Sequence, residues 1–175
     1  GRVLVESAQY YESPIGKMLL TADTEGLTGI WFVNQKFYPL HPETTYVDEN
    51  TEILERAAQW LDSYFSGKNP GSGLPLHLTG TSFQKAVWEI LLTIPYGETM
   101  TYGEIAQMIA KQLSYQTMSA QAVGGAVGHN RISIVIPCHR VLGTNGSLTG
   151  YAGGIWRKEA LLKLEHSPIQ TPKTN

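Results

Sequence analysis

The sequence predicts an α/β (α+β) fold, in which a small amino-terminal antiparallel sheet with one helix precedes a helical carboxy-terminal domain with a helix-turn-helix-like element. Three observations predict it. Strand-like runs separated by turn sequences fill residues 7–33, Gly and Pro concentrate in residues 67–80, and two capping boxes begin helical patterns beyond residue 80. We therefore expect one domain over residues 1–78, a second over residues 79–166 and a flexible tail over residues 167–175.

The first domain is predicted to hold the sheet. Residues 17–22 and 27–33 read as strands, and residues 13–16 and 23–26 read as the turns beside them. Residues 37–50 contain two prolines and little periodicity, which predicts a loop. Asn50 can cap a helix that ends at Gly67. Its apolar residues form one stripe that should lie on the sheet: Ile53, Leu54, Ala57, Trp60, Leu61, Tyr64 and Phe65.

The second domain begins with the two capping boxes. Thr81 and Gln84 form the first, and the helix they begin is expected to stop at Pro95. Thr101 and Glu104 form the second, and residues 111–116 then connect to a further helix over residues 118–127. The residues expected to face the core from the first two helices are Phe83, Val87, Ile90, Leu91, Ile105, Ala106 and Ile109.

The helix over residues 118–127 carries small residues along nearly its whole length, including Gly124 and Gly125. Each glycine costs a helix about 1 kcal/mol relative to alanine, so another surface should approach closely there. A DNA backbone and a second helix are the two alternatives, and the residues alone leave both open.

The single cysteine stands at the end of an apolar run. Residues 132–136 are typical of a short, largely buried strand, which Pro137 ends. Cys138 would follow that strand, with His139 and Arg140 available as a proton relay or as a cation that lowers the thiol pKa from about 8.5. The alternative is a buried cysteine that acts only as a small hydrophobe.

Elements after the cysteine complete the chain. Residues 143–146 predict a turn, and residues 149–154 form a Gly-rich loop that should lie near Cys138. A final amphipathic helix with Ile155, Leu161, Leu162 and Leu164 should end near Glu165.

Composition limits the class of protein. The chain has 175 residues, 42% of them hydrophobic, and one cysteine, which excludes an internal disulfide and a cysteine-rich zinc site. Residues 1–80 add only His41 and His77, so we expect no metal there. The absence of a membrane-length apolar stretch and of a leader-like sequence leads us to expect a cytoplasmic protein. Residues 1–80 carry a charge of −5 and residues 81–175 a charge of +3, a weak pointer to a nucleic-acid-facing second half.

The sequence Pro137-Cys138-His139-Arg140-Val141, preceded by Asn130 and followed by the loop over residues 150–154, resembles the active site of the O6-alkylguanine-DNA alkyltransferases. These are also called methylated-DNA-protein-cysteine methyltransferases. The resemblance is close over about residues 81–165. It implies a DNA repair protein that flips an alkylated guanine out through the minor groove and moves the alkyl group onto its own cysteine. The reaction would be stoichiometric and self-inactivating, with no cofactor, on double-stranded DNA that contains O6-alkylguanine. The protein would be a monomer with no obligate protein partner and no membrane association.

The resemblance also assigns roles. Cys138 would be the nucleophile, His139 would relay its proton toward Glu165, and Tyr102 would hydrogen-bond the base. Val141, Tyr151 and Asn130 would form the pocket around the base, Asn130 also tying the recognition helix to the cysteine segment. The helix-turn-helix-like element would bind DNA, and the residues expected to contact DNA are Thr101, Tyr102, Ser119, Ala120, Gln121, Ala122, Gly124, Arg131 and Arg140.

Two positions depart from the family pattern, and two other functions compete with this one. Gln121 stands where the family inserts an arginine into the base stack, and Arg131 stands where it has a proline. One alternative is a non-catalytic lesion-binding relative, although those relatives lack the cysteine. The other is a Cys-His-Glu hydrolase, which would turn over without keeping an adduct.

Overall fold

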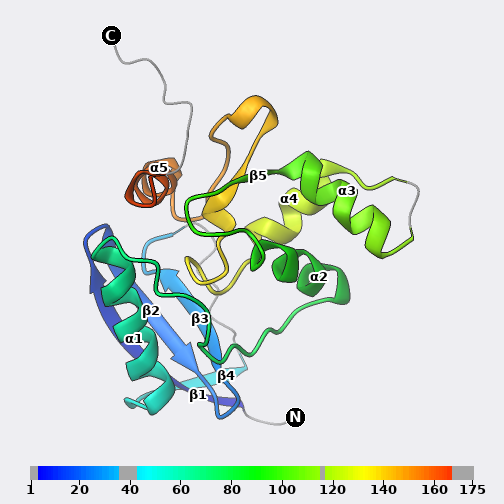
Figure 1. The fold of residues 1–175 in the computed structure, drawn as a ribbon. Helices are drawn as coiled ribbons and strands as arrows, with labels where there is room; N and C mark the ends of the chain where they lie inside the picture. The colour runs from blue at the N-terminus through cyan, green and yellow to red at the C-terminus, as the bar shows by residue number, and fades with distance from the viewer. Residues whose placement is uncertain (1–3, 36–42, 115–116, 167–175) are drawn as a thin grey trace. The chain divides into compact units, whose positions relative to one another are not determined.

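The computed structural model describes residues 4–35, 43–114 and 117–166. Residues 37–42 of the predicted loop, including His41, and the predicted tail over residues 167–175 lie outside these ranges. The chain forms two compact units (Figure 1). The first contains residues up to Thr79 together with Arg131–Ser133, and the second contains Gly80–Asn130 and the residues from Ile134 onward.

The first unit is built on a four-stranded sheet in the order β3-β2-β1-β4. Strands β1 (Leu4–Ser13), β2 (Gly16–Ala22) and β3 (Leu27–Phe32) are antiparallel, as the turn sequences predicted. Strand β4 (Thr44–Asp48) lies parallel to β1 and pairs Thr44 with Leu4. It corrects the predicted loop over residues 37–50, since the prolines there precede β4 and leave a run with Thr, Tyr and Val that suits a strand.

Helix α1 (Glu52–Phe65) packs against β1, β2 and β3 of this sheet. Leu54, Ala57, Leu61 and Tyr64 are buried, so the predicted stripe faces the sheet. The capping residue is Thr51 and not Asn50: Thr51 has extended dihedrals, and its side chain accepts a hydrogen bond from the Leu54 backbone N–H.

Two segments cover the edge strand β3. The Leu27 backbone N–H donates to the Pro75 carbonyl at 2.8 Å, and the His77 N–H donates to the Leu27 carbonyl at 2.8 Å. Farther along β3, Ile30 exchanges backbone hydrogen bonds with Arg131 and Ser133, at 2.9 and 2.8 Å. The Gly- and Pro-rich stretch is therefore partly fixed to the sheet, and the edge of β3 is satisfied where these segments pair with it.

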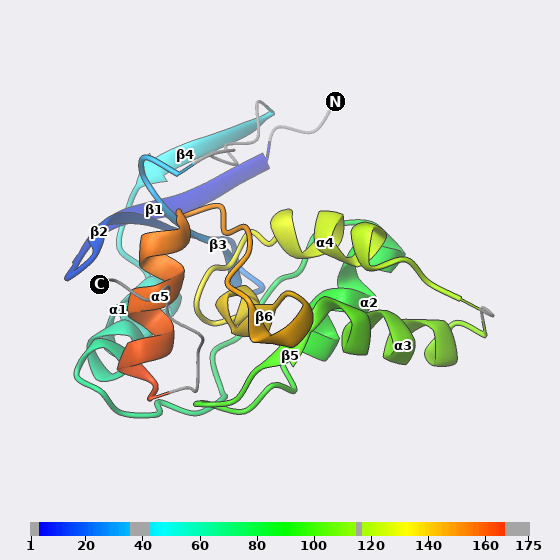
Figure 2. The ribbon, with the colours of Figure 1, turned by 90° about the horizontal axis from the view of Figure 1, so that it is seen from above.

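The second unit contains helices α2 (Ser82–Leu91), α3 (Tyr102–Gln112), α4 (Ala120–Gly128) and α5 (Ile155–Leu164). Both predicted capping boxes form, with Thr81 and Thr101 as the caps. Helices α2, α3 and α4 pack on one another (Figure 2), and the Trp88 indole donates to the Ala126 carbonyl at 2.9 Å. Strands β5 (Met100–Thr101) and β6 (Val141–Leu142) form a short parallel pair.

Two sequence predictions for the part of the chain beyond α4 are corrected. Residues 132–136 are largely buried as predicted, yet they do not form a strand. Ile134 has φ of 70°, a left-handed conformation that interrupts an extended chain, and only an isolated bridge joins Ile132 to Ile30. In α5, Leu161 and Leu162 are buried as predicted, but Ile155 is 41% exposed, and Arg157 and Lys158 in the same first turn are buried in its place.

No helix in the described ranges has the length and apolar character needed to cross a membrane.

Candidate active site

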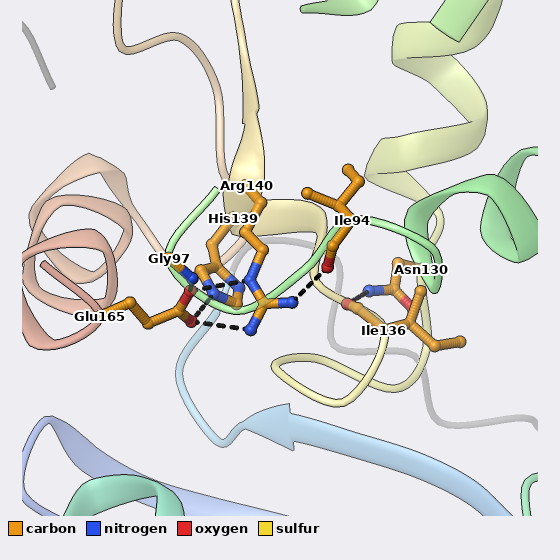
Figure 3. Close-up of polar contacts among 7 residues, drawn as sticks. All are labelled: Ile94, Gly97, Asn130, Ile136, His139, Arg140 and Glu165. Atoms are coloured by element: carbon orange, nitrogen blue, oxygen red, sulfur yellow. Dashed lines mark hydrogen bonds and ion pairs between the residues drawn. The ribbon is translucent and has the colours of Figure 1, made fainter. Parts of the chain in front are cut away.

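Cys138 is the first residue of a short 3-10 turn (Cys138–Arg140) that follows Pro137. Its backbone N–H donates to the Ile136 carbonyl at 2.8 Å, and the residue is 8% exposed. Asn130, just beyond the end of α4, donates its side-chain amide to the same Ile136 carbonyl at 2.8 Å (Figure 3). Asn130 also hydrogen-bonds the Cys138 side chain. One buried amide therefore joins the end of α4 to the cysteine segment.

Burial raises the pKa of the Cys138 thiol above its ordinary value, because a thiolate is poorly solvated there. The hydrogen bond from Asn130 and the charge of Lys158 act in the opposite direction and are smaller. Of the two roles that the sequence offered, the cation that lowers this pKa is Lys158 and not His139 or Arg140, while the backbone of His139 contributes a hydrogen bond that also lowers it. The thiol is thus neutral at pH 7 and needs a base when it reacts.

Three residues, Gly97, His139 and Arg140, surround the Glu165 carboxylate beside the cysteine turn, and we call these four residues the buried polar cluster (Figure 3). His139 Nε2 lies 2.6 Å from Glu165 Oε2, and both side chains are fully buried. Arg140 donates from Nε to Oε1 at 2.8 Å and from its Nη2 to Oε2 at 3.2 Å. The Gly97 backbone N–H donates to Oε1 at 3.1 Å. Each carboxylate oxygen therefore accepts two hydrogen bonds.

His139 can serve as the base. Burial lowers its pKa below the ordinary value, Glu165 opposes this, and the positive charges of Arg140 and Lys158 act in the same direction as burial. The ring is therefore neutral at pH 7. Because a carboxylate only accepts, Nε2 carries the ring proton that faces Glu165, and Nδ1 is the acceptor nitrogen.

Arg140 was predicted to contact DNA, and the structure corrects this. Its guanidinium is buried, holds Glu165 in a forked pair and donates from Nη1 to the Ile94 carbonyl at 2.7 Å. A paired, buried guanidinium is not available to phosphate. Its role in the fold is to fix the carboxylate that faces His139.

Lys158 is a residue of this site that the sequence analysis missed. It is fully buried in α5, and its ammonium donates to the carbonyls of Val141 and Thr149, the latter at 2.8 Å. Burial lowers its pKa to about 8, with Cys138 opposing. The sequence did contain a signal for its burial. Lys158 lies three residues before Leu161 and four before Leu162, a spacing that places it on the same buried face of the helix.

A groove runs beside this site, between the start of α3, the exposed side of α4 and the loop around residues 143–149. It is lined by Thr101, Tyr102, Gly103, Glu104, Gln107, Ala120, Gln121, Gly124, Gly143, Thr144, Asn145, Ser147 and Thr149. Five of the predicted DNA contacts are thus together, while Ser119, the capping residue before α4, and Ala122 on α4 are exposed outside the lining. Among the described residues, no lysine or arginine lines this groove.

The structure does not place all predicted pocket residues in that groove. Val141 is fully buried, Tyr151 is half-buried, and neither they nor Cys138 line it. Arg131 is half-buried in the segment that pairs with β3. Within the described part of the chain, no group of three or more His, Cys, Asp or Glu side chains could hold a metal ion.

The two consecutive glycines of α4, Gly124 and Gly125, have room for a side chain. A Cβ added to Gly124 would lie 3.9 Å from the Tyr102 ring, an ordinary contact, and one added to Gly125 would meet nothing within 4 Å. Packing among the described residues therefore does not require glycine at either position. Of the two alternatives that the sequence left open, the approach of another molecule explains the glycines better than helix packing does.

Comparison with known proteins places the chain in a family. Residues 82–167 match the family model "6-O-methylguanine DNA methyltransferase, DNA binding domain", and residues 8–78 match "6-O-methylguanine DNA methyltransferase, ribonuclease-like domain". A methylated-DNA--protein-cysteine methyltransferase of Methanosarcina acetivorans is 46% identical over 157 residues, 90% of this chain and 96% of that protein. The protein of the same name from Mycobacterium tuberculosis H37Rv is 45% identical over 156 residues, 89% of this chain and 90% of that protein. The crystal structure of Mycobacterium tuberculosis OGT in complex with DNA superposes with a TM-score of 0.78 at 41% identity, over 94% of this chain and 96% of that chain. The chain belongs to the 6-O-methylguanine DNA methyltransferase family.

Proposed function

We propose that this protein repairs DNA by moving an alkyl group from O6 of guanine to the sulfur of Cys138. One observation carries the proposal. The buried Cys138 is followed in the chain by the neutral His139, and the Glu165 carboxylate lies 2.6 Å from the His139 ring. This is the order of nucleophile, base and orienting acid that covalent catalysis requires.

The proposed reaction is a displacement at the alkyl carbon. The S–C bond to Cys138 forms while the C–O6 bond breaks, and the electron pair of that bond stays on guanine O6. The thiol proton passes to His139 Nδ1, and Glu165 stabilises the imidazolium that results. Guanine then takes up a proton to become the normal base. The thioether left on Cys138 does not return to a thiol, because thiols and water do not cleave its C–S bond at neutral pH.

Tyr102 is proposed to hydrogen-bond the flipped base. It is the first residue of α3, it lines the groove, and burial raises its pKa above the ordinary value, so that the phenol remains a donor at pH 7. The target oxygen lies inside the DNA stack, so the nucleotide must leave the duplex at a cost of a few kcal/mol. A fixed donor at the groove offsets part of that cost.

Helix α4 is proposed to enter the minor groove. Its exposed residues Ala120, Gln121 and Ala122 are small or neutral, Gly124 is half-buried, and the space beside Gly124 supports a close approach by a DNA backbone. We expect Gln121 to fill the stack where the base has left, with less area and no charge compared with arginine.

The protein is proposed to be a cytoplasmic monomer. We infer that the protein acts as a monomer on double-stranded DNA, since one chain supplies the nucleophile, the base and the groove. A single cysteine whose function needs a free thiol suits the reducing cytoplasm.

The test uses a duplex with one O6-methylguanine and the full-length chain. After incubation, peptide mapping should find one methyl group on Cys138 and normal guanine in the DNA, while Cys138→Ser should leave the lesion intact. Binding of the lesion without an adduct, equal in wild type and Cys138→Ser, would favour the lesion-binding alternative. Continuous hydrolysis of a small ester or amide without an adduct would favour the hydrolase.

A further inference from the structure

The groove beside the active site offers no positive charge to DNA. Among the described residues that line it, the charged one is Glu104, whose carboxylate accepts hydrogen bonds from the backbone N–H and the hydroxyl of Thr101. Affinity for duplex DNA comes in large part from lysines and arginines that neutralise its phosphates. A cation that serves DNA binding should therefore lie next to the groove and not in it.

Most cations of the second unit are already engaged within the chain. Those that are buried or ion-paired are Arg140, Arg157, Lys158 and Lys163. In the described part of this unit, Lys85 on α2 and Lys111 on α3 remain. Both are exposed, and neither forms an ion pair with the described residues. These two lysines are therefore the ones available to a phosphate.

Lys111 lines a second hollow that adjoins the groove. The residues around this hollow are Gly103, Ala106, Gln107, Ala110, Lys111, Thr117, Met118 and Ala120. Gly103, Gln107 and Ala120 also line the groove, so the two share a border. Lys85 lines neither of them. Position thus separates the two available lysines, and Lys111 is the one beside the groove.

One side of α3 connects the groove to Lys111. Gly103, Gln107 and Lys111 are all exposed and follow one another at intervals of four residues, so they lie on the same side of the helix, about 6 Å apart along its axis. Figure 2 shows α3 and α4 side by side, with their connection at the end away from β5. Lys111 lies in the last turn of α3, near that connection. It therefore stands at the outer end of a surface that begins in the groove.

We propose that Lys111 binds a backbone phosphate of duplex DNA and extends the DNA contact from the groove to the second hollow. The proposal rests on the function proposed above and deepens it, because it names a residue that supplies the electrostatic part of binding. Phosphates follow one another about every 3.4 Å along each strand, and a lysine side chain is long and flexible. A duplex along this side of α3 thus presents a phosphate to Lys111 in any register. Such a contact carries no base information and takes no part in the chemistry at Cys138.

The experiment measures the affinity of the full-length chain for an undamaged duplex by fluorescence titration at a series of salt concentrations. Lys111→Gln should reduce the slope of log affinity against log salt by about 0.9, the share of one phosphate, and weaken binding about five- to tenfold near 0.1 M salt. Lys111→Arg should keep the wild-type slope. Lys85→Gln is the matched control, since Lys85 is exposed on a helix of the same unit but lines neither hollow, and it should leave the slope unchanged. At saturating O6-methylguanine duplex, Lys111→Gln should transfer methyl at the wild-type rate.

The outcomes separate this inference from the proposed function. If wild type repairs the lesion and Lys111→Gln keeps the wild-type slope, Lys111 does not bind phosphate and the proposed function stands. An equal loss of slope in Lys85→Gln would also contradict the inference, because the effect would then come from net charge and not from position. If wild type binds the duplex but acquires no methyl group, the proposed function is wrong, and the salt slopes still decide whether Lys111 binds DNA.

Discussion

Two parts of the second unit, the buried polar cluster and helix α4, differ in burial and in charge. In the buried polar cluster, Glu165 is fully buried and accepts four hydrogen bonds, from Gly97, His139 and Arg140. The exposed side of helix α4 instead carries almost no functional groups, and its consecutive glycines Gly124 and Gly125 have space for a side chain. The cluster contains charge that needs partners within the chain, while α4 leaves room for a partner outside it.

This difference predicts how substitutions in each part affect stability and reaction rate. A buried ion pair tolerates little change, because removal of one partner leaves the other charge without compensation. A glycine in an exposed helix weakens folding, and its replacement by alanine should strengthen it. We therefore expect substitutions in the cluster to reduce both stability and reaction rate, and substitutions in α4 to separate the two.

The largest effect is expected for Glu165→Gln. The neutral amide leaves the Arg140 charge buried without its counter-charge and no longer stabilises a charged His139. Unfolding in urea should show a loss of about 3 kcal/mol. Single-turnover methyl transfer should fall about a hundredfold or more, as for loss of support to a general base.

The matched control is Glu159→Gln in α5, the helix that ends just before Glu165. Glu159 forms an i,i+4 pair with Lys163 at 2.8 Å, and the Lys163 side chain is 61% exposed. Its loss should cost at most about 0.5 kcal/mol and leave the transfer rate unchanged. A Glu165→Gln variant that reacts at the wild-type rate would show that Glu165 does not support His139.

The second largest effect is expected in the pH dependence of Cys138 reactivity in the absence of DNA. Because burial raises the Cys138 pKa, the thiol form persists through neutral pH, and the thiolate fraction should grow about tenfold for each pH unit up to that pKa. Alkylation by iodoacetamide, followed by mass spectrometry, should be slow at pH 7 and should still be rising at pH 9. Protein unfolded in urea provides the reference, with a midpoint near the ordinary value of about 8.5. A plateau below pH 8 in the folded protein would mean that the thiolate exists before DNA binds.

A smaller effect, of several-fold, is expected for Gln121→Arg in α4. A flat cation fills the vacated stack better and can reach a phosphate, so transfer from duplex DNA should be faster. The slope of log affinity against log salt should steepen by at most about one unit. Transfer from the free alkylated base needs no flipping and should hardly change. If neither Gln121→Arg nor Gln121→Ala alters the duplex rate, residue 121 is not the inserted element, and Arg131 should be tested next.

The smallest effect distinguishes Gly124 from Gly125 in α4. Gly124→Ala and Gly125→Ala should each stabilise folding by about 1 kcal/mol in urea unfolding, since neither added Cβ meets an obstacle closer than ordinary contact. Gly124 lines the groove and Gly125 does not, so only Gly124→Ala should weaken duplex affinity in a fluorescence titration. Equal affinities in both variants and in wild type would mean that α4 does not approach DNA at Gly124.

Local signals in the sequence predicted much of this architecture. The capping boxes at Thr81 and Thr101 form as expected because each depends on four consecutive residues. Strand β4 was missed because its partner β1 begins forty residues earlier, at Leu4 opposite Thr44, and nothing in the local pattern reports that pairing. Ile134 was placed in a strand because an isoleucine gives no local sign of a positive φ.

In the site, too, features set by neighbouring residues could be predicted, and features set by distant residues could not. Cys138, His139 and Glu165 could be named from a motif, but the motif did not say where Arg140 points. Its partner is 25 residues away in the chain, and the guanidinium turns inward because Glu165 is buried there. Lys158 was missed for a related reason, since its three backbone acceptors come from a strand and a loop that only the fold brings together.

The central claim is that Cys138 accepts one alkyl group and is then spent. Intact-mass measurement tests it most directly, with wild type and Cys138→Ser each incubated with excess duplex that contains O6-methylguanine. The account predicts that every wild-type molecule gains the mass of a single methyl group, that one lesion is repaired per molecule, and that Cys138→Ser gains nothing. Repair of more than one lesion per molecule, or a methyl group on Cys138→Ser, would contradict it.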